Sequence, residues 1–561
     1  MASGDLVTRI YGPFRGVDFR GKEINISRSP DSLNMWKDYT EVESIRTRPG
    51  LELQHDFENK IYGIFEYKVN DREMLLVHSG TKLYKLEAGE REVVYECLNP
   101  LQSQSFIFNE KFFFKDGLNY LVYDGETAEE VIGYVPTTSI ARRPLGGGSI
   151  YQDVNILSSF RKNSFLADGK EKEYHLDAQK IDEDYVPEIT VNGELVTTFT
   201  FNPAEGVIKF DTAPPEPYTD GQDNVVIKFR KTVPEHQNMI KRCTLLESFD
   251  NRIFFAGNQN YPNTLWHSSL NDPSYCSDQD YYVEGMDLSR IKSIVAGNDA
   301  LIVLKEPSQA KTSIFLHQPI VDGEYGKIYP TIQSNIATGC VGSGINFNDD
   351  IVFFSERGLE GLNGEITKEK AVAHRSTLVD TKLVKEPRYQ DMQLVEWNGY
   401  LLAFIDNKVY LADSRAMFSN VDHYEYEWFY WELEKEVICA KVINGMLYIG
   451  AEDGIYTLTD HEAAVESFWT TPIDRFDNYQ FLKTTNKKGC VVEATGNINI
   501  YVKTNDSEWE PVGKYESIED YFVGRIKKKK FKDLQIKFFS NKRFSLERVS
   551  LECYVGGYIK R

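Results

Sequence analysis

The sequence predicts an all-β protein built around a β-propeller of about seven blades, within a range of six to eight, with an inserted small β domain and a C-terminal antiparallel β domain. Three observations predict this architecture. Hairpin signals recur at a nearly constant step, aromatic residues make up 13% of the chain and suit half-buried pleated surfaces, and long helical patterns are nearly absent. A hydrophobic fraction of 41% in 561 residues is ample for a folded core.

Each hairpin signal is a two-residue turn that begins with Asn or Asp and precedes an apolar run. Such turns need positive φ angles, which Asn, Asp and Gly tolerate best. The turns are Asn70-Asp71, Asn109-Glu110, Asp250-Asn251, Asn298-Asp299, Asp349-Asp350, Asn398-Gly399 and Asn444-Gly445. Most steps between them are about 40 to 50 residues, the period of four-stranded propeller blades. Residues 80–86, 117–123, 407–412 and 454–458 are expected to form third strands. The alternative is a run of unrelated hairpins in a sandwich.

The one long step, between the turns at residues 109 and 250, falls to the common period when residues 150–241 are left out. We therefore divide the chain into an N-terminal segment that closes the propeller (1–55), the first blades (56–149), an inserted β domain (150–241), the remaining blades (242–465) and a C-terminal β platform (466–561). Inserted domains tend to sit at exposed loop tips, where they can contact a neighbouring subunit.

Local signals predict strands in both smaller domains. In the insertion, strand 189–191 leads into the hairpin turn Asn192-Gly193, and strands 199–201, 207–210 and 224–229 follow. In the C-terminal domain, residues 490–494 and 498–502 are expected to pair around Thr495-Gly496-Asn497. Residues 531–539 and 545–555 are expected to be further strands.

Charge and cysteine usage restrict the function. The chain has 64 Lys and Arg against 85 Asp and Glu, a formal net charge of −21, which argues against a broad basic face that grips nucleic acid but not against a protein that surrounds DNA. We expect no membrane span and no signal peptide. The seven cysteines lack a CxxC pair, which favours reduced thiols over disulfides or zinc.

Catalytic signatures are not found. The sequence has neither a phosphate-binding loop nor a dinucleotide-binding GxGxxG, and the Asp-box of sialidase-type propellers is missing. Residues 182–184, Asp-Glu-Asp, are better interpreted as a solvated acidic loop than as a cation site. We therefore predict that the protein is not an enzyme, and we assign no catalytic, cofactor-binding or metal-binding residue.

One basic run stands out against the acidic background: Arg525, Lys527, Lys528, Lys529, Lys530 and Lys532. It could contact a phosphate backbone or an acidic partner surface. It could instead be a solvated edge strand, on which Lys discourages aggregation. We favour the second interpretation and keep the first as an alternative.

Two stretches carry a resemblance to a known family. The first is Ser29–Trp36, continuing to Ile45–Leu51 with Arg-Pro-Gly-Leu; the second runs from Asn251 through Asn263 to Leu270–Tyr275. The first resembles an N-terminal signature of tailed-bacteriophage neck and tail proteins, and the second is similar to a phrase in minor structural proteins of phages of low-GC Gram-positive hosts. The broader group is the tail-hub or nozzle family, which is related to packaged-DNA-stabilisation proteins. The resemblance covers about residues 20–460.

The resemblance implies a structural virion protein of the tail or neck, assembled in the host cytoplasm. Family members are propellers that form a ring, often a hexamer, below the portal and adaptor. Implied partners are other copies of the chain, portal, adaptor and other tail proteins, and viral DNA that passes through without sequence-specific binding. An acidic lumen would repel phosphates and let DNA slide. Arg46 and Arg48, beside Pro49-Gly50, would be structural and pair with carboxylates of this or the next subunit.

Two alternatives belong to other classes. A receptor-binding or glycan-cleaving tail propeller would present aromatic residues and carboxylates at a propeller mouth. A cytoplasmic WD-like scaffold is disfavoured because the repeats lack Gly-His and Trp-Asp signatures.

Overall fold

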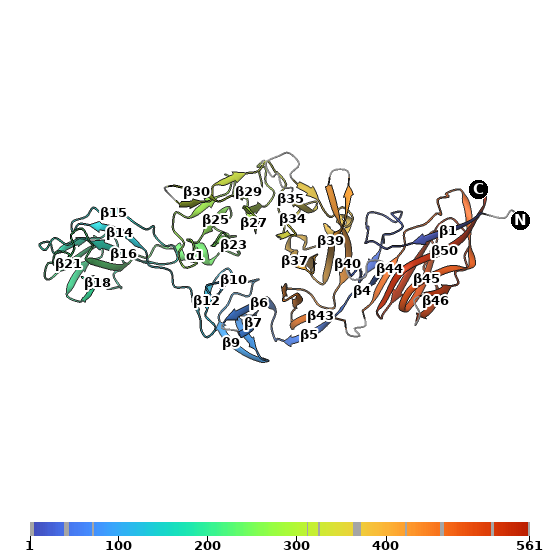
Figure 1. The fold of residues 1–561 in the computed structure, drawn as a ribbon, viewed down its shortest axis with the longest axis horizontal. Helices are drawn as coiled ribbons and strands as arrows, with labels where there is room; N and C mark the ends of the chain where they lie inside the picture. Colours follow the sequence, from blue (N-terminus) through green and yellow to red (C-terminus); the bar gives the residue numbers. More distant parts are fainter. Residues whose placement is uncertain are drawn as a thin grey trace.

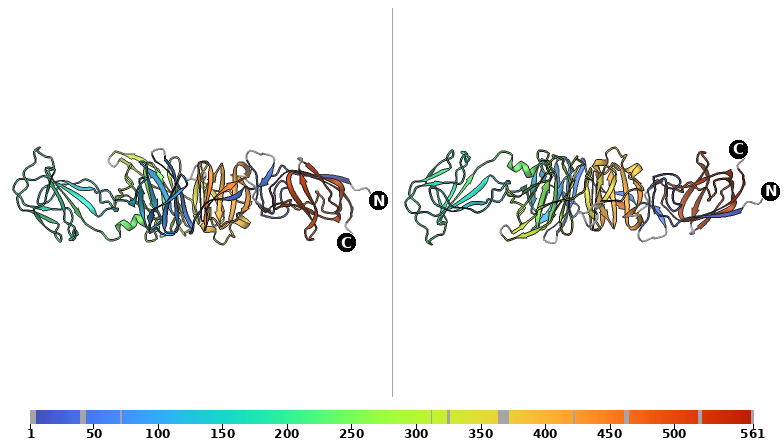
Figure 2. Two further views of the ribbon diagram at one scale, coloured as in Figure 1. Left: turned by 90° about the horizontal axis from the view of Figure 1, so that it is seen from below. Right: turned by 90° about the horizontal axis from the view of Figure 1, so that it is seen from above.

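The computed structural model describes residues 5–38, 44–69, 72–310, 312–323, 326–362, 372–420, 423–460, 465–517 and 521–558. Across these residues the chain is almost entirely β, which confirms the predicted class; the helices are α1 (His236–Lys241), α2 (Asp380–Leu383) and the 3-10 turn η1 (Tyr389–Asp391). Figure 1 shows three β units in a row, with a ring of small sheets in the middle. Figure 2 shows the same row from two further sides, with the ring seen edge-on as a disc.

Four-stranded antiparallel meanders form the ring. Within the described ranges there are six separate four-stranded sheets, and β37–β40 form a seventh such group inside a larger sheet. In chain order, the first group is β6 (Ile61–Val69), β7 (Arg72–Ser79), β8 (Lys82–Glu87) and β9 (Glu90–Glu96), and the second is β10 (Gln104–Phe108), β11 (Lys111–Lys115), β12 (Tyr120–Tyr123) and β13 (Ala128–Glu130). The third is β23 (Leu245–Phe249), β24 (Arg252–Ala256), β25 (Thr264–His267) and β26 (Tyr281–Val283), and the fourth is β27 (Ile291–Ala296), β28 (Leu301–Lys305), β29 (Ile314–His317) and β32 (Thr331–Gln333). The fifth is β33 (Gly344–Phe347), β34 (Asp350–Ser355), β35 (Gly358–Leu362) and β36 (Val372–His374); the sixth is β37 (Gln393–Trp397), β38 (Tyr400–Ile405), β39 (Lys408–Asn420) and β40 (His423–Glu432); and the seventh is β41 (Cys439–Ile443), β42 (Met446–Gly450), β43 (Gly454–Thr459) and β5 (Gly50–Asp56). A short hairpin, β30 (Ile320–Asp322) and β31 (Gly326–Ile328), projects between β29 and β32.

The first strands of these groups meet around a centre. β6 contacts β10, β10 contacts β23, and the cycle continues through β27, β33, β37 and β41 back to β6. The last group takes its fourth strand from the N-terminal part of the chain, since β5 pairs with β43 through registers such as Leu51 with Leu458. This closed, propeller-like arrangement leaves only short edges, which is how such folds limit edge-to-edge aggregation.

Most predicted hairpin turns are confirmed, although Asn298-Asp299 closes the hairpin between β27 and β28 without positive φ angles. Positive φ angles occur at Asn109 and Glu110, at Asp250 and Asn251, and at the two Asn-Gly pairs that begin at residues 398 and 444. In the hairpin between β33 and β34 the pair is Asn348 and Asp349, one residue earlier than predicted. The turn predicted at Asn70-Asp71 lies outside the described residues. The four predicted third strands correspond to β8, β12, β39 and β43.

Neighbouring groups pack face to face, so their central strands are buried on both sides. Every residue of β28 and of β38 is buried. One interface joins Phe254, Leu265, Val303 and Phe315 between the third and fourth groups. Burial of each such side chain stabilises the fold by roughly 1.5–3 kcal/mol, so aromatic strands can hold adjacent sheets together without helices.

The inserted unit has its own core. Its strands are β14 (Thr137–Arg142), β15 (Ser149–Ile150), β16 (Phe160–Phe165), β17 (Glu173–His175), β18 (Glu188–Val191), β19 (Glu194–Val196), β20 (Phe199–Asn202), β21 (Val207–Phe210) and β22 (Val225–Arg230). They form a six-stranded and a three-stranded sheet around Phe165, Tyr174, Ile208 and Phe229. The predicted strands and the Asn192-Gly193 turn are present. The first strand, β14, lies before residue 150, the boundary that the period of the turns predicts.

The C-terminal unit combines both ends of the chain. Its strands are β1 (Asp5–Tyr11), β2 (Ser32–Leu33), β3 (Met35–Trp36), β4 (Ile45–Thr47), β44 (Ser467–Thr470), β45 (Phe481–Thr504), β46 (Glu510–Ser517), β47 (Tyr521–Gly524), β48 (Lys529–Phe531), β49 (Leu534–Ser540) and β50 (Phe544–Tyr558). They belong to a 15-stranded sheet that also includes β37–β40.

The hairpin predicted around Thr495-Gly496-Asn497 is wrong. Residues 481–504 form one strand, β45, in which Gly496 has a φ of +91° but the chain does not reverse. The strand pairs with β50 up to Gly496 and with β49 from Asn499. Long-range partners on both sides therefore override the local turn signal.

Candidate functional site

The two stretches that carry the family resemblance form the two junctions of the molecule. The first builds the junction between the ring and the C-terminal unit, with Asn34 and Arg48 at its centre. The second builds the attachment of the inserted unit to the ring.

Arg48 lies at the first junction with 1% of its surface exposed. Its Nε donates to Asn34 Oδ1 at 2.9 Å, and its Nη2 donates to the carbonyl of Glu432 at 2.7 Å and to Glu434 Oε1 at 2.8 Å. Burial lowers the pKa of Arg48, and the charge of Glu434 opposes that shift. The Arg48 guanidinium therefore binds acceptors of its own chain, and its several N–H groups donate to them at the same time.

Asn34 completes this network. The residue has a φ of +56°, in the left-handed region that Asn tolerates. Its Oδ1 also accepts from the Glu432 backbone N–H at 2.8 Å, and its Nδ2 donates to the Glu466 carbonyl at 2.8 Å. One amide thus links the ring strand β40, the N-terminal segment and the start of the C-terminal unit.

Arg46 sits nearby and is partly exposed. Its Nη2 donates to Asp38, and its guanidinium lies 5.7 Å from the centroid of the Trp36 ring. Both predicted arginines therefore pair with carboxylates of this subunit. That is one of the two pairings that the sequence left open.

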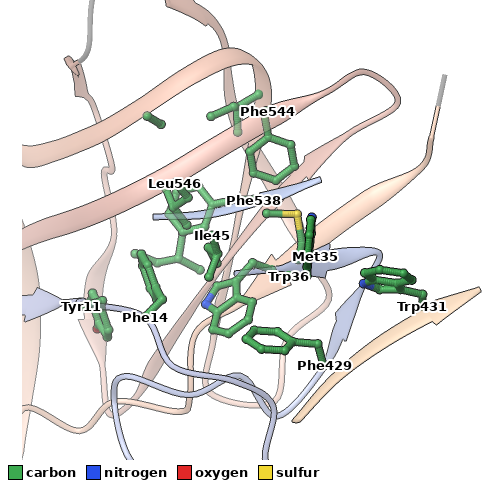
Figure 3. Packing of buried hydrophobic residues seen from close by; sticks show 14 of the residues in the cluster. Tyr11, Phe14, Met35, Trp36, Ile45, Phe429, Trp431, Phe538, Phe544 and Leu546 are labelled. Atoms are coloured by element: carbon green, nitrogen blue, oxygen red, sulfur yellow. The ribbon is translucent and has the colours of Figure 1, made fainter. Parts of the chain in front are cut away.

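The core around these residues is aromatic. Trp36 lies 5.5 Å from Trp431 and 5.8 Å from Trp397, measured between ring centroids. Figure 3 shows Met35, Trp36 and Ile45 between Phe429 and Trp431 of the ring and Phe538, Phe544 and Leu546 of the C-terminal unit. The ring and the C-terminal unit thus share one hydrophobic cluster.

The second resembling stretch holds the base of the inserted unit. Asn258 Nδ2 donates to the Met239 carbonyl of α1 at 2.9 Å, and Tyr275 Oη donates to the Asp153 carbonyl at 2.9 Å. From the other side, fully buried Asn155 donates to the Ser274 carbonyl at 2.9 Å. These bonds fasten the segment before β16 and the segment after β22 to the ring.

The predicted basic run lies on the C-terminal unit. Ile526 and Phe531 are buried and anchor it, while Arg525, Lys527, Lys529, Lys530 and Lys532 are exposed. Lys528 pairs with Glu510 at 2.5 Å. In the described part of the chain, the five exposed cations make no ion pair. The basic patch, meaning these five residues, is therefore open to an acidic surface or to a phosphate backbone.

A cavity of about 590 Å³ lies at the centre of the ring, lined by residues of all seven first strands. Polar side chains on its wall bridge neighbouring groups: Gln104 accepts from the Leu246 N–H at 2.7 Å, and Gln393 donates to the Ile438 carbonyl at 2.6 Å. Burial raises the pKa of Glu247 on this wall to about 7, with Lys441 opposing the shift. Glu247 could not be predicted from the sequence, because its burial results from closure of the ring.

The structure offers little other chemistry where it describes the chain. No group of three or more His, Cys, Asp or Glu side chains could hold a metal ion in the described ranges. In the acidic loop, Asp182 Oδ2 accepts from Arg230 Nε at 2.6 Å and from the Thr232 hydroxyl at 2.6 Å. All seven cysteines are free, and all except Cys97 are buried. No helix of the described segments is long and apolar enough to cross a bilayer.

Comparisons with known proteins give weak likenesses. No protein-family model matches the chain, and no curated protein matches it. Among solved structures it is similar to BamB from Moraxella catarrhalis, with 10% identity, a TM-score of 0.34, and coverage of 78% of this chain and 96% of that one. It is also similar to an exo-β-1,3-galactanase from Phanerochaete chrysosporium, with 10% identity, a TM-score of 0.22, and coverage of 55% and 94%. Likenesses of this strength support no argument about function.

Proposed function

We propose that this chain is a structural protein of a tailed-bacteriophage virion, a nozzle or tail-hub subunit that forms a ring below the portal and extends the DNA channel. In this proposal the protein is not an enzyme, and its partners are copies of itself, the portal or adaptor, and other tail proteins. It helps to retain genomic DNA and to release it.

The observation that carries the proposal is the position of the two resembling stretches. One forms the Arg48–Asn34 junction and the other fastens the linkers of the inserted unit. Both stretches have an architectural role, because they hold three β units in a row (Figure 1). An elongated subunit of this kind can pack side by side around an axis and expose different units to different partners.

In the proposal the ring of sheets is a propeller of seven blades. The support is the closed cycle of seven first strands and the N-terminal strand β5, which completes the last four-stranded group. Closure by a strand from the other end of the chain joins the first and last blades.

DNA in this proposal passes between subunits and not through the propeller. The central cavity of about 590 Å³ has the size of a small-molecule pocket, which is roughly 300–1,000 Å³. A lumen wide enough for duplex DNA therefore requires several copies around it. The net charge of −21 per chain would repel the phosphates and keep the DNA from sticking.

The proposal is tested by measuring copy number. Native mass spectrometry of the purified chain and quantitative proteomics of particles should give a fixed low copy number per virion and a closed ring on a portal complex. Absence from particles, together with binding or cleavage of a glycan, would instead support the receptor-binding or glycan-cleaving alternative.

The basic patch provides a test at the level of residues. The quadruple variant K527Q/K529Q/K530Q/K532Q is expected to weaken assembly onto the acidic ring or its partners, because it removes four unpaired cations. The control K170Q/K172Q/K180Q removes three exposed lysines of the inserted unit. Equal ring yield for the two variants in native mass spectrometry would indicate that the basic patch takes no part in assembly and only limits aggregation.

A further inference from the structure

A second cavity lies where the inserted unit joins the ring. The chain enters the inserted unit first through β14, and residues 151–159 then return to the ring. The outgoing linker leads from there into β16, and the returning linker leaves β22 and runs into α1. The Lys231 N–H donates to the Ser159 carbonyl at 2.8 Å, so the two linkers lie side by side. A pocket of about 290 Å³ opens here, lined by residues of both linkers; we call it the linker pocket.

Arg161 is the notable cation of the linker pocket. It projects from β16, and in the described part of the chain its guanidinium makes no ion pair and no hydrogen bond. Burial lowers the pKa of Arg161, and Asp177 and Asp278 oppose the shift from beyond ion-pair distance. A partly buried arginine without an acceptor is costly, because its lost hydration is not replaced.

Lys231 adds a second cation on the facing linker. Its Nζ donates to the Gln179 carbonyl at 2.9 Å and makes no ion pair within the described ranges. Burial lowers the pKa of Lys231, and the neighbouring charge of Arg161 lowers it further. Two cations therefore line one pocket.

The carboxylate that lines the linker pocket, Glu235, already has partners of its own. Glu235 pairs with Arg242 at 2.9 Å and accepts from Asn238 at 3.1 Å. One residue before Lys231, Arg230 has the partners that Arg161 lacks, since its Nε contacts Asp182 at 2.6 Å and its Nη2 contacts Asp184. The contrast singles out Arg161 as the guanidinium that has no acceptor among the described residues.

We propose that the linker pocket binds a small oxyanion, a phosphate or a carboxylate-bearing molecule, with Arg161 as the forked donor and Lys231 as the second charge. A guanidinium offers two parallel N–H donors that match the oxygens of either group. The bound anion would bridge β16 and the returning linker. It would thereby stiffen the attachment of the inserted unit to the ring.

The test uses the full chain with inorganic phosphate and citrate as probes. Isothermal titration at neutral pH and constant ionic strength should show saturable binding of at least one probe, with one site per chain. Binding of phosphate but not of citrate would indicate a phosphoryl ligand, and binding of citrate but not of phosphate would indicate a carboxylate ligand. R161Q and K231Q are each expected to weaken binding by about tenfold or more, the loss of one charge-assisted hydrogen bond.

The matched control is R143Q, which removes an exposed arginine of the same unit and should bind like the wild type. If circular dichroism shows that R161Q does not fold, R161K replaces it, because lysine keeps the charge and loses the fork. Wild-type protein that binds neither probe, or unchanged binding by the folded Arg161 variant, would overturn the inference.

Discussion

Arg48 joins stretches of chain that lie far apart in the sequence. Its side chain contacts Asn34 and Glu432 in addition to its own neighbour Pro49, whose carbonyl accepts from Nη1 at 2.8 Å. Folding takes hydrogen bonds to water away from these acceptors, and the hydrogen bonds that Arg48 donates replace them. Single residues of this kind determine where a whole unit is held.

Substitution R48A is expected to destabilise the junction by about 3 kcal/mol, because buried acceptors lose their donor at roughly 1–3 kcal/mol each. R48K should recover part of the loss. The control R548Q, whose exposed arginine lies 3.8 Å from the partly exposed Glu493 in the C-terminal unit, should cost less than about 1 kcal/mol. Urea denaturation followed by tryptophan fluorescence checks this, since Trp36 and Trp431 lie at the junction. Equal midpoints for R48A and R548Q would contradict the assignment.

His374 is expected to make stability depend on pH. Burial by itself lowers the pKa of His374, but hydrogen bonds to Asp380 at 2.6 Å and to Glu360 outweigh it and raise the pKa to about 9. The folded pKa lies above the unfolded value of about 6.5, so this contribution is full below pH 6.5 and is lost as the pH rises toward 9.

Urea midpoints measured between pH 6 and pH 9 test this prediction. The wild type should lose stability across that range, and H374Q should show a flatter profile, because it lacks the titrating group. A wild-type profile with the same slope as that of H374Q would show that the two carboxylates do not hold the imidazolium.

At the scale of elements, turn chemistry and strand partners compete. Asn444 and Gly445 have φ angles of +50° and +78° and close the hairpin between β41 and β42. Gly496 also has a positive φ, yet it lies inside β45, whose edges are paired on both sides. A turn signal therefore predicts a hairpin only where no longer-range partner competes for the same backbone groups.

Substitution G445A is expected to lower stability by about 1 kcal/mol, because a side chain disfavours the positive φ that this turn requires. No neighbouring atom lies within 4 Å of the added Cβ, so the cost comes from the backbone alone. Gly21 provides the matched control, since its added Cβ also meets nothing within 4 Å and its φ lies outside the left-handed region. G21A should fall within about 0.5 kcal/mol of the wild type in thermal denaturation; an equal loss for both variants would refute the explanation.

At the scale of the whole molecule, the three units differ in independence. The cluster around Trp36 joins the ring to the C-terminal unit, whereas the core of the inserted unit is confined to residues 165–229. The inserted unit should therefore be separable and the C-terminal unit should not. The linkers themselves belong to the ring, because Ile156 and Leu157 pack in its core.

Excision of residues 137–150 and 160–230, with two glycines joining Pro136 to Tyr151 and Ser159 to Lys231, removes all strands of the inserted unit and is expected to leave the ring and the C-terminal unit folded. The joins are short because the Gln152 N–H donates to the Thr137 carbonyl at 3.1 Å and the Lys231 N–H donates to the Ser159 carbonyl at 2.8 Å. Thermal denaturation and size-exclusion chromatography should show a monomeric species with a cooperative transition close to that of the parent. Aggregation or loss of the transition would show that the inserted unit supports the ring.

The class of the fold could be predicted from the chain alone, because hairpin turns and alternating apolar strands are encoded within a few residues. The period of the turns likewise revealed the insertion, although its first strand, β14, begins earlier than expected. The cluster of lysines in the sequence also indicated a solvated basic run, and the buried residues Ile526 and Phe531 anchor this run to the C-terminal unit. These features depend on local conformational preferences, which a linear sequence carries in full.

Contacts between distant residues were decided by tertiary structure. The contacts of Arg48 with Asn34 and Glu434 and the burial of Glu247 on the wall of the central cavity depend on which segments pack together. The same holds for Arg161, which has no partner among the residues that the structure describes. The long strand β45 is a further case, since its partners β49 and β50 come later in the chain. The physical reason is that pairing energy and burial depend on the neighbours that folding brings together, and no window of local sequence contains them.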